Sequence, residues 1–367
     1  NIIKVDSTKK VLNEISKKWI KHFKQTVIAI TGSNGKTTTK EILTSIFSYI
    51  YKSNNTKGNY NSSIGLPVNL FNFSLDAEIN IIEMGASKPN EIDQLCQIVK
   101  PHYSVITNIH NAHIANFNTF EELVKTKLSI FKNTINQGLI FENNDDINIS
   151  KYCEDKKNKI TFGFKNSKVD FFGKLKLSDN DFQFSVNGKN IHNKYLNKIM
   201  AKNILASYSI ARTYGIDHEN IVKALKNFNF VKGRGRHINK NGYLIIDDTY
   251  NANFESFKSG IDSFMNITNK GRKILVIGDM KELGVRSKQD HINLGKYINK
   301  HTPDIVFSYG ELVSETINEI QNSNTISKHF KEMKTLIENL KTDLMKDDAI
   351  YLKASRSLNF ENIIKEI

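Results

Sequence analysis

Residues 26–38 of the chain, Thr-Val-Ile-Ala-Ile-Thr-Gly-Ser-Asn-Gly-Lys-Thr-Thr, join an almost wholly apolar run to a glycine-rich turn. The run that ends at Thr31 has the composition of a buried parallel strand, and from Lys36 onward the apolar residues follow helical spacing. A loop of this kind offers backbone N–H groups to phosphate oxygens, while Lys36 can reach the terminal phosphates and Thr37 can offer a hydroxyl to Mg²⁺. The usual pattern has a glycine six residues before the lysine, where this chain has Ile30. The sequence therefore predicts a variant phosphate loop.

The sequence around this loop alternates between strand-like and helical patterns. Apolar runs typical of buried strands occur at 79–84, 104–109 and 139–142, and helical patterns occur at 9–24, 90–99, 119–133, 199–214 and 217–227. Such alternation predicts a parallel, doubly wound sheet. Between about residues 158 and 190 the pattern changes to short alternating runs, which predict antiparallel hairpins in an insertion or a flanking sheet.

A second α/β unit is predicted after residues 233–236, Gly-Arg-Gly-Arg, whose glycine content is typical of a hinge. Its expected strands are 243–248, 273–277, 304–309 and 349–353, and its expected helices are 253–267, 288–300 and 331–344. The predicted fold class is α/β: a central P-loop ATPase-like domain with a mostly parallel sheet, followed by a C-terminal Rossmann-like α/β domain.

Length and composition exclude several classes of protein. The 367 residues suffice for two or three domains, and no apolar run approaches the roughly 18 residues of a spanning helix. Without a signal-peptide pattern, we expect a cytoplasmic protein with no membrane span. Cys96 and Cys153 stand alone, which argues against disulfides and a zinc site. The net charge is +14, but only six of the 52 cationic residues are arginine, so we expect no nucleic-acid partner.

Three further residues are candidates for chemistry, each with a structural alternative. Glu83 ends an apolar strand at the sheet edge where ligands bind and could hold Mg²⁺, or it could be a solvated strand-end carboxylate. His113 follows the run at 104–109 and could be a ligand or an ordinary loop residue. Lys127 lies in a helical pattern whose default interpretation in so lysine-rich a chain is a solvated face.

Taken together, these pieces resemble the ATP-dependent Mur ligases from the phosphate loop to the C-terminus. The similar segments are Thr31–Thr37, Gly58–Pro67, Glu83–Ala86, Asn111–His113, Lys127–Phe131, Gly233–Arg236, Asp247–Asn253, Gly278–Gly284 and Lys353–Ser357. The phosphate loop is specific for the superfamily. The runs Asp-Asp-Thr-Tyr-Asn-Ala-Asn and Gly-Asp-Met-Lys-Glu-Leu-Gly are most similar to those of the ligases that add D-alanyl-D-alanine to UDP-N-acetylmuramoyl-tripeptide.

The resemblance implies a set of site residues. It assigns ATP binding to Thr31, Gly32, Ser33, Asn34, Gly35, Lys36, Thr37, Thr38, Asn203, Arg234, Asp248 and Asn251, with Asn203 facing the adenine. It assigns two Mg²⁺ ions to Thr37, Glu83, His113 and Lys127, with a carbamate on Lys127, and catalysis to Lys36, Lys127 and His113. Tyr250 and Asn253 would line the same cleft, and Arg356 would meet the incoming dipeptide.

The chain also departs from the family at several positions. Ile199 and Met200 replace a His-Asn pair before Asn203, Phe254 replaces a proline, and Ala354 replaces a glycine.

From the resemblance we expect residues 1–25 to be the remnant of an N-terminal UDP-binding domain and its linker, residues 26–231 the ATP-binding domain, and residues 232–367 the ligase domain.

The resemblance implies an activity and its partners. We expect ATP-dependent amide formation between UDP-N-acetylmuramoyl-tripeptide and D-alanyl-D-alanine through an acyl phosphate, for peptidoglycan precursor synthesis, by a monomer. The alternatives are another ligase of the superfamily, a nucleotide-binding module that no longer catalyses, and a nucleic-acid-binding protein whose binding is sensitive to salt but not to ATP.

Overall fold

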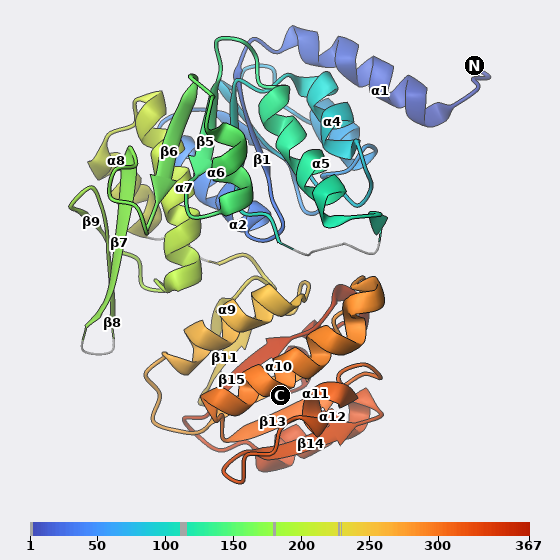
Figure 1. The fold of residues 1–367 in the computed structure, drawn as a ribbon, viewed down its shortest axis with the longest axis vertical. Helices are drawn as coiled ribbons and strands as arrows, with labels where there is room; N and C mark the ends of the chain where they lie inside the picture. The colour runs from blue at the N-terminus through green and yellow to red at the C-terminus, as the bar shows by residue number, and fades with distance from the viewer. Residues whose placement is uncertain (1–2, 111–115, 179–180, 227, 229) are drawn as a thin grey trace.

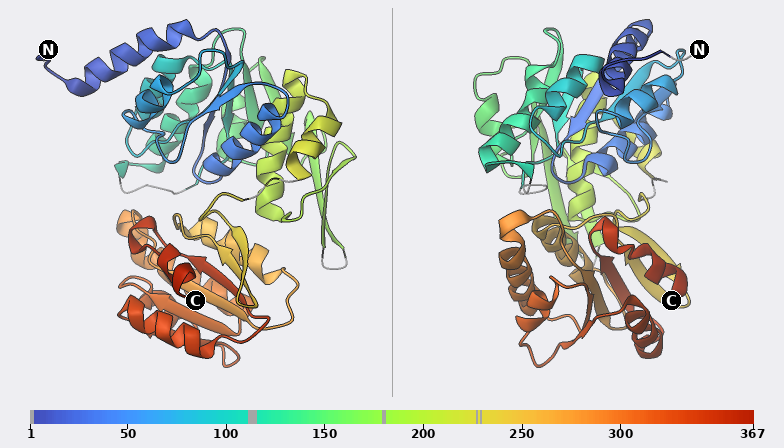
Figure 2. Two further views of the ribbon diagram at one scale, coloured as in Figure 1. Left: turned by 180° about the vertical axis from the view of Figure 1, so that it is seen from behind. Right: turned by 90° about the vertical axis from the view of Figure 1, so that its right-hand side faces the viewer.

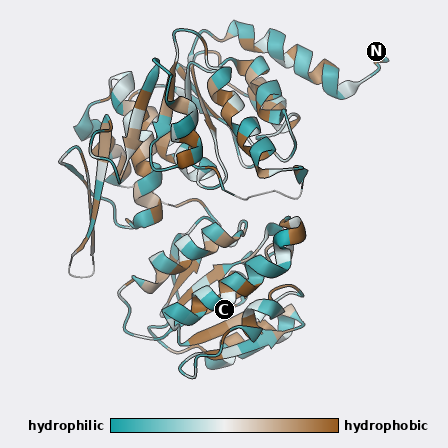
Figure 3. Cartoon of the chain, in the orientation of Figure 1, coloured by the Kyte–Doolittle hydropathy of each residue, from teal (hydrophilic) through white to brown (hydrophobic). Residues whose placement is uncertain are grey.

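The structure is a computed structural model that describes residues 3–110, 116–178, 181–226, 228 and 230–367. It contains two α/β units that lie one above the other, with the chain passing between them near residue 232 (Figure 1). The apolar stretches lie along the strands and the inner helix faces, and the outer helix faces are polar (Figure 3).

The first unit is built on a sheet with nine strands among the described residues. Its order is β2(Ser53–Asn55), β3(Ile79–Glu83), β1(Thr26–Thr31), β4(Tyr103–Ile106), β5(Leu139–Asn143), β6(Lys159–Gly163), β7(Phe171–Ser178), β8(Asp181–Val186) and β9(Lys189–Ile191). The strands pair in parallel from β2 to β7, and the last two pairings are antiparallel. Central β1 puts Ile28 and Ile30 into one core and Val27 and Ala29 into the other, because alternate side chains point to opposite faces.

Helices cover both faces of this sheet. One face packs against α2(Lys36–Ser48), α7(Lys198–Tyr214) and α8(His218–Lys226), and the other packs against α3(Gly65–Phe71), α4(Glu91–Val99), α5(Phe120–Lys132) and α6(Ile147–Cys153). Helix α1(Thr8–Trp19) and the 3₁₀ turn η1(Ile20–His22) lie outside α3 and α4, where the Trp19 indole donates to the Leu70 carbonyl at 2.9 Å.

The second unit has a sheet with six strands in the described chain. Its order is β10(Arg236–Lys240), β11(Tyr243–Asp247), β15(Ala349–Lys353), β12(Lys273–Gly278), β13(Ile305–Tyr309) and β14(Ile326–Phe330), and only the pairing of β10 with β11 is antiparallel. The helices and 3₁₀ turns are α9(Phe254–Met265), η3(Gly284–Arg286), α10(Ser287–His301), α11(Ser314–Asn318), α12(Met333–Asp343), η4(Arg356–Leu358) and α13(Glu361–Glu366). Helices α9 to α11 cover one face, and α12 and α13 cover the other.

The α/β class and the two sheets confirm the predicted fold, with several local differences. The hairpins predicted at 158–190 continue the main sheet, because β6 pairs with β5 and β7 in parallel register. Helical structure predicted to residue 24 ends in a 3₁₀ turn at His22. The pattern also misses β2, Ser-Asn-Asn, and the edge strand β14, Ile-Ser-Lys-His-Phe, because neither carries a long apolar run.

The two sheets lie on either side of the predicted boundary at residues 231–232, and their carboxyl edges face each other (Figure 2). The phosphate loop after β1 and the loops after β11, β12 and β15 therefore meet in one region. No helix in the described ranges has the length and apolar character needed to cross a membrane.

Candidate active site

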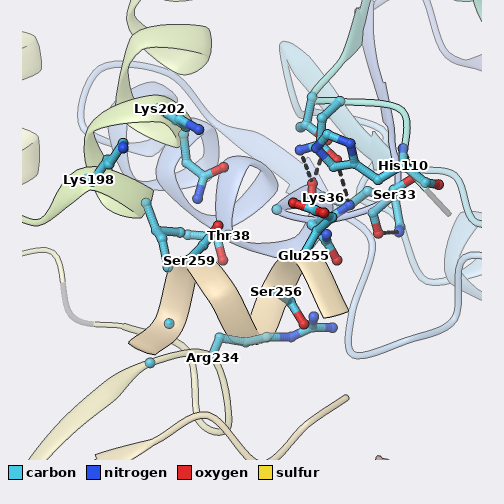
Figure 4. A pocket seen from close by; sticks show the side chains of 18 of the residues that line it. Ser33, Lys36, Thr38, His110, Lys198, Lys202, Arg234, Glu255, Ser256 and Ser259 are labelled. Atoms are coloured by element: carbon cyan, nitrogen blue, oxygen red, sulfur yellow. Dashed lines mark hydrogen bonds between the residues drawn. The ribbon is translucent and has the colours of Figure 1, made fainter. Parts of the chain in front are cut away.

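A cleft of about 1660 Å³ separates the carboxyl edges of the two sheets. The first unit contributes the phosphate loop, Glu83 and part of α7, and the second contributes the loops after β11, β12 and β15 and one face of α9. Figure 4 shows Ser33, Lys36 and His110 of the first unit near Glu255 and Ser256 of α9. A large concave site with polar groups from two units is a typical substrate site.

Two glycines allow the phosphate loop to adopt its conformation. Gly32 has φ +147°, and a Cβ there would lie 1.9 Å from Oγ1 of Thr107. Gly35 has φ +82°, and its Cβ would lie 2.5 Å from Oδ1 of Asn203. Both positions therefore require glycine for backbone angle and for space.

Polar side chains after β4 hold the loop in place, and the sequence reasoning did not select them. Asn108 accepts from the Asn34 amide N–H and donates to the Asn34 carbonyl, both at 3.0 Å. The Thr107 hydroxyl donates to the same carbonyl at 2.6 Å. The run predicted at 104–109 contains both residues, but β4 ends at Ile106, so they lie just beyond its carboxyl end. The signal that could have found them is their polar character at the end of an otherwise apolar run, at the carboxyl edge beside the loop.

Lys36 begins α2, and its side chain folds back over the phosphate loop. Nζ donates to the carbonyls of Gly32 at 2.8 Å and Ser33 at 3.2 Å. Burial lowers the pKa of Lys36 to about 8, with an opposing effect from Glu83 and a smaller lowering from Arg234. The amine thus lies at the loop, where a phosphate oxygen could replace the carbonyls as its acceptor.

Lys127 of α5 does not lie on a solvated helix face. Its side chain is only 2% exposed, and Nζ reaches the Gly32 carbonyl at 3.4 Å. Burial, with a smaller contribution from the Lys36 cation, lowers the pKa of Lys127 to about 7. The structure therefore places a readily deprotonated amine directly beneath the phosphate loop.

Glu83 ends β3 beside β1, and it is 2% exposed. Its Oε1 accepts from Nδ2 of Asn61 at 2.7 Å, whereas its buried Oε2 has no hydrogen-bond partner. A buried carboxylate oxygen without a partner at a phosphate loop fits a divalent cation, which takes oxygen donors. Asn61 lies in the segment Gly58–Pro67 that resembles the family, but the motif by itself predicts no role for it.

The remaining predicted cation ligands are only partly placed. His113 lies outside the described residues, and the described ranges contain no group of three or more His, Cys, Asp or Glu side chains that could hold a metal. Thr37 is nearly buried in the first turn of α2, and its Oγ1 accepts from Nη2 of Arg234 at 3.3 Å. Glu83 and Thr37 are thus the described oxygen donors at the loop that fit Mg²⁺.

The other predicted residues of the first unit lie around the same loop. The Thr31 hydroxyl donates to the Met84 carbonyl at 2.8 Å, and Ser33 and Thr38 line the cleft. Oδ1 of Asn203 accepts from the Thr39 hydroxyl at 3.3 Å, while its buried Nδ2 has no partner. Asn203 of α7 therefore lies beside the first turn of α2 with a free donor, which is compatible with its predicted contact to the adenine.

The second unit brings Arg234 and Asp248 to the cleft. The Arg234 guanidinium stacks on the Tyr250 ring, 3.6 Å from the ring centroid. Oδ2 of Asp248 accepts from the Tyr351 hydroxyl at 2.8 Å and from Lys353 Nζ at 2.5 Å. Tyr351 is a residue that the sequence reasoning missed, and neighbouring β15 supplies both donors.

The loop after β11 is tied to β15 and to the phosphate loop. Lys353 Nζ also donates to the Asn251 carbonyl at 3.1 Å, and the Asn253 amide contacts the Asn34 amide at 2.9 Å. Arg356, by contrast, is exposed at the cleft and pairs with Glu361 at 2.6 Å. The structure thus brings together the predicted nucleotide residues of both units.

Comparisons with known proteins agree with this arrangement. Residues 30–211 match the Mur ligase middle domain, and residues 233–356 match the Mur ligase, glutamate ligase domain. The UDP-N-acetylmuramoyl-tripeptide–D-alanyl-D-alanine ligase of Bacillus subtilis is 31% identical over 376 residues, covering 100% of this chain and 81% of that protein. The ligase of the same name from Borreliella burgdorferi is 32% identical, covering 92% of this chain and 73% of that protein.

Solved structures show the same relationship. MurF ligase from Thermotoga maritima, in complex with ADP, has a TM-score of 0.88 and 31% identity, covering 100% of this chain and 84% of that chain. MurF from Acinetobacter baumannii has a TM-score of 0.89 and 27% identity, covering 99% of this chain and 81% of that chain. With both domain matches on one chain, and with relatives above 30% identity that align with at least 92% of it, the chain belongs to the Mur ligase family.

Proposed function

We propose that this chain is an ATP-dependent ligase that joins D-alanyl-D-alanine to UDP-N-acetylmuramoyl-tripeptide in peptidoglycan precursor synthesis. The observation that carries the proposal is the single cleft in which a phosphate loop, a buried lysine and an unpartnered buried carboxylate oxygen face polar side chains of the second unit. The names of the relatives in Bacillus subtilis and Borreliella burgdorferi supply the two substrates.

The reaction consists of two transfers. A carboxylate oxygen of the tripeptide attacks the γ-phosphorus of ATP, the bond to the β-phosphate oxygen breaks, and ADP leaves. The dipeptide amine then attacks the acyl carbon, loses a proton, and inorganic phosphate leaves as the amide forms. Both steps develop charge on oxygens, so catalysis depends on positioning and on fixed positive charge.

Lys36 and Arg234 provide this positive charge from opposite sides of the cleft. Lys36 has to exchange the carbonyls of Gly32 and Ser33 for phosphate oxygens, and Arg234 has to leave the Thr37 hydroxyl. These contacts keep the two cations at the loop before substrates bind, which lowers the cost of organising the site. We assign the remaining nucleotide contacts to Asn203, Asp248 and Asn251, as the sequence predicts.

We propose that Thr37 holds one Mg²⁺, and that Glu83, His113 and a carbamate on Lys127 hold a second. Bound Mg²⁺ would neutralise charge on the phosphates during transfer. The unpartnered Oε2 of Glu83 supports its role as a cation ligand. The burial of Lys127 and its pKa of about 7 support the carbamate, because carbamate formation requires the neutral amine.

We further propose that residues 26–231 act as the ATP-binding domain and residues 232–367 as the ligase domain of a cytoplasmic monomer. Water has to be kept from the acyl phosphate between the two steps. Movement of the second unit about residues 233–236 could provide this closure, since Gly233 and Gly235 both have positive φ.

Replacement of Lys36 tests the proposed function. Lys36→Ala should reduce ATP-dependent formation of the amide product at least a hundredfold, because the lysine is a fixed charge at the transferred phosphate. Lys52→Ala, which removes an exposed lysine paired with Asp76, is the matched control and should retain activity. Product is measured by mass spectrometry with saturating ATP, tripeptide nucleotide and dipeptide.

The same assay separates the alternatives. If the wild-type protein joins a different amine more efficiently than D-alanyl-D-alanine, the chain is another ligase of the superfamily. If it binds ATP but forms no product with any amine, it is a nucleotide-binding module. Retention of activity by Lys36→Ala would contradict the mechanism.

A further inference from the structure

A pair of asparagine amides joins the two units at the phosphate loop. Nδ2 of Asn253 donates to Oδ1 of Asn34 at 2.9 Å, and Nδ2 of Asn34 approaches Oδ1 of Asn253 at 3.4 Å. The partners are 219 residues apart in sequence. The pair connects the loop expected to hold the ATP phosphates directly to Asn253, the last residue of the motif Asp247–Asn253 and the N-cap of α9.

The orientation of Asn253 is fixed within the second unit. Its side chain is 8% exposed, and its Oδ1 accepts from the backbone N–H of Ser256 at 2.9 Å. The Ser256 hydroxyl in turn accepts from the backbone N–H of Asn253 at 3.0 Å, which completes a capping box at the start of α9. With Oδ1 held by the cap, Nδ2 is the group that points to the phosphate loop.

Asn34 is fixed equally well in the first unit. Asn108 binds both its backbone N–H and its carbonyl, and Thr107 binds the same carbonyl. The backbone of Asn34 is thus held by the segment that follows β4, and its side-chain amide is left to meet Asn253. Two rigidly held partners lose little side-chain entropy when they form the contact.

The contact between Arg234 and Thr37, the other polar contact described between the two units, differs from the amide pair. Arg234 binds the Thr37 hydroxyl, a group that the proposed function assigns to Mg²⁺, so this contact has to change when substrates bind. The amide pair involves no group assigned to Mg²⁺, although Asn34 belongs to the predicted ATP-binding loop, and the side-chain amides carry no net charge. It can therefore persist through the reaction.

We propose that Asn34 and Asn253 form a latch that sets the position of the second unit against the phosphate loop, and that Asn253 is a positioning residue for the amide-forming step. This inference rests on the proposed function, because it assigns the arrival of the amine to the second unit. Without the latch, the acyl phosphate and the amine are at reacting distance for a smaller fraction of the time. Amide formation therefore slows more than phosphoryl transfer does.

A double-mutant cycle isolates the latch from the helix cap. Asn253→Ser keeps a favourable N-cap residue but removes the amide that reaches Asn34. Asn34→Ala removes the other partner while its backbone contacts remain. Asn339→Ser is the matched control, because half-buried Asn339 donates within α12 at 2.9 Å and does not line the cleft.

The first readout is structural and does not depend on activity. Spin labels at exposed Lys132 and Lys334 report the distance between the units, after the buried Cys96 and Cys153 are replaced by alanine. Asn253→Ser and Asn34→Ala should each broaden the distance distribution, and the double variant should match the single ones. Asn339→Ser should match the wild type.

The second readout compares the two transfers. The single-turnover burst of ADP formation without dipeptide measures the first, and product formation at low dipeptide concentration measures both. Each single variant should lose five- to tenfold more in the second assay than in the first, which corresponds to about one hydrogen bond. The double variant should lose no more than the worse single variant.

Two results would overturn the latch: unchanged distance distributions in both single variants, or losses that multiply in the double variant as they do for independent sites. Failure of the proposed function is recognised separately. In that case the wild-type protein forms no amide product, whereas the distance measurement still reports whether the amide pair holds the units together.

Discussion

The buried amine of Lys127 gives the most direct test of the proposed cation site. At pH 8 an ordinary lysine with a pKa near 10.4 is neutral in roughly four molecules per thousand. With a pKa of about 7, Lys127 is neutral in roughly nine of ten. The neutral amine attacks CO₂, forms a C–N bond and releases one proton, which leaves a carbamate whose oxygens can bind a cation. We therefore expect Lys127 to be selectively carbamylated.

The selectivity can be measured with ¹³C-labelled bicarbonate. At pH 8, with ATP and Mg²⁺, the wild-type protein should show one carbamate resonance, which alkylation and peptide mass spectrometry should locate at Lys127. The resonance should be absent in Lys127→Arg. Lys40 is an internal control, since it is equally buried but is held by the Glu41 carboxylate at 2.6 Å and the Thr56 carbonyl at 2.6 Å.

The same pKa predicts how the modification depends on pH. Between pH 8 and pH 6 the neutral fraction of Lys127 falls from roughly nine in ten to one in ten, so most of the carbamate should be lost over this range. The reasoning is refuted if Lys127 remains a free amine at pH 8 with ATP and Mg²⁺ present. It is equally refuted if the exposed lysines are modified to the same extent.

Three further predictions concern the loop, the cleft and stability. Gly32→Ala should weaken ADP binding at least tenfold in calorimetry and lower the free energy of unfolding by about 2 kcal/mol, because the new Cβ would lie 1.9 Å from Oγ1 of Thr107. Wild-type affinity in this variant would contradict the requirement for glycine at position 32. Arg234→Lys should raise the KM for ATP about fivefold, because an ammonium cannot stack on Tyr250 as a planar guanidinium does; an unchanged KM would argue against this role. Above about pH 7 the folded chain loses the Lys127 proton while the unfolded chain keeps it, so the free energy of unfolding should rise from pH 7 to pH 9, by about 2 kcal/mol more in the wild type than in Lys127→Met. Urea denaturation in CO₂-free buffer measures this difference, and an equal pH dependence in the two proteins would refute the burial effect.

Local patterns in the sequence were sufficient for most of the fold. The run that ends at Thr31, the glycines of the loop and the helical spacing from Lys36 predict a strand, a turn and a helix without information from elsewhere in the chain. Strands such as β12 are equally visible because both faces are buried and the residues are almost all apolar. Short or polar strands such as β2 lack this signal, and their neighbours in the sheet hold them in place.

Site residues that belong to a known motif could be predicted from the sequence. Residues whose chemistry depends on burial were harder to predict. Because the chain is so rich in lysine, its composition predicted that Lys127 lies on a solvated helix face, and only the family resemblance assigned it a role. Its place beneath the Gly32 carbonyl depends on how α5 packs against β1 and β4, which no local pattern reports. The low pKa is a property of that packing, because desolvation acts only once the helix is docked.

The sequence determined the class of fold, the phosphate loop and the family, since these depend on residue order and on spacing within short segments. The tertiary structure determined which groups meet: Asn61 with Glu83, and Asn34 with Asn253. Such pairs arise where two loops leave the carboxyl edges of different strands or sheets, and their distance depends on sheet order and domain packing. Periodicity along the chain carries no information about that distance, so the cleft and the contact between its two sides became visible only in three dimensions.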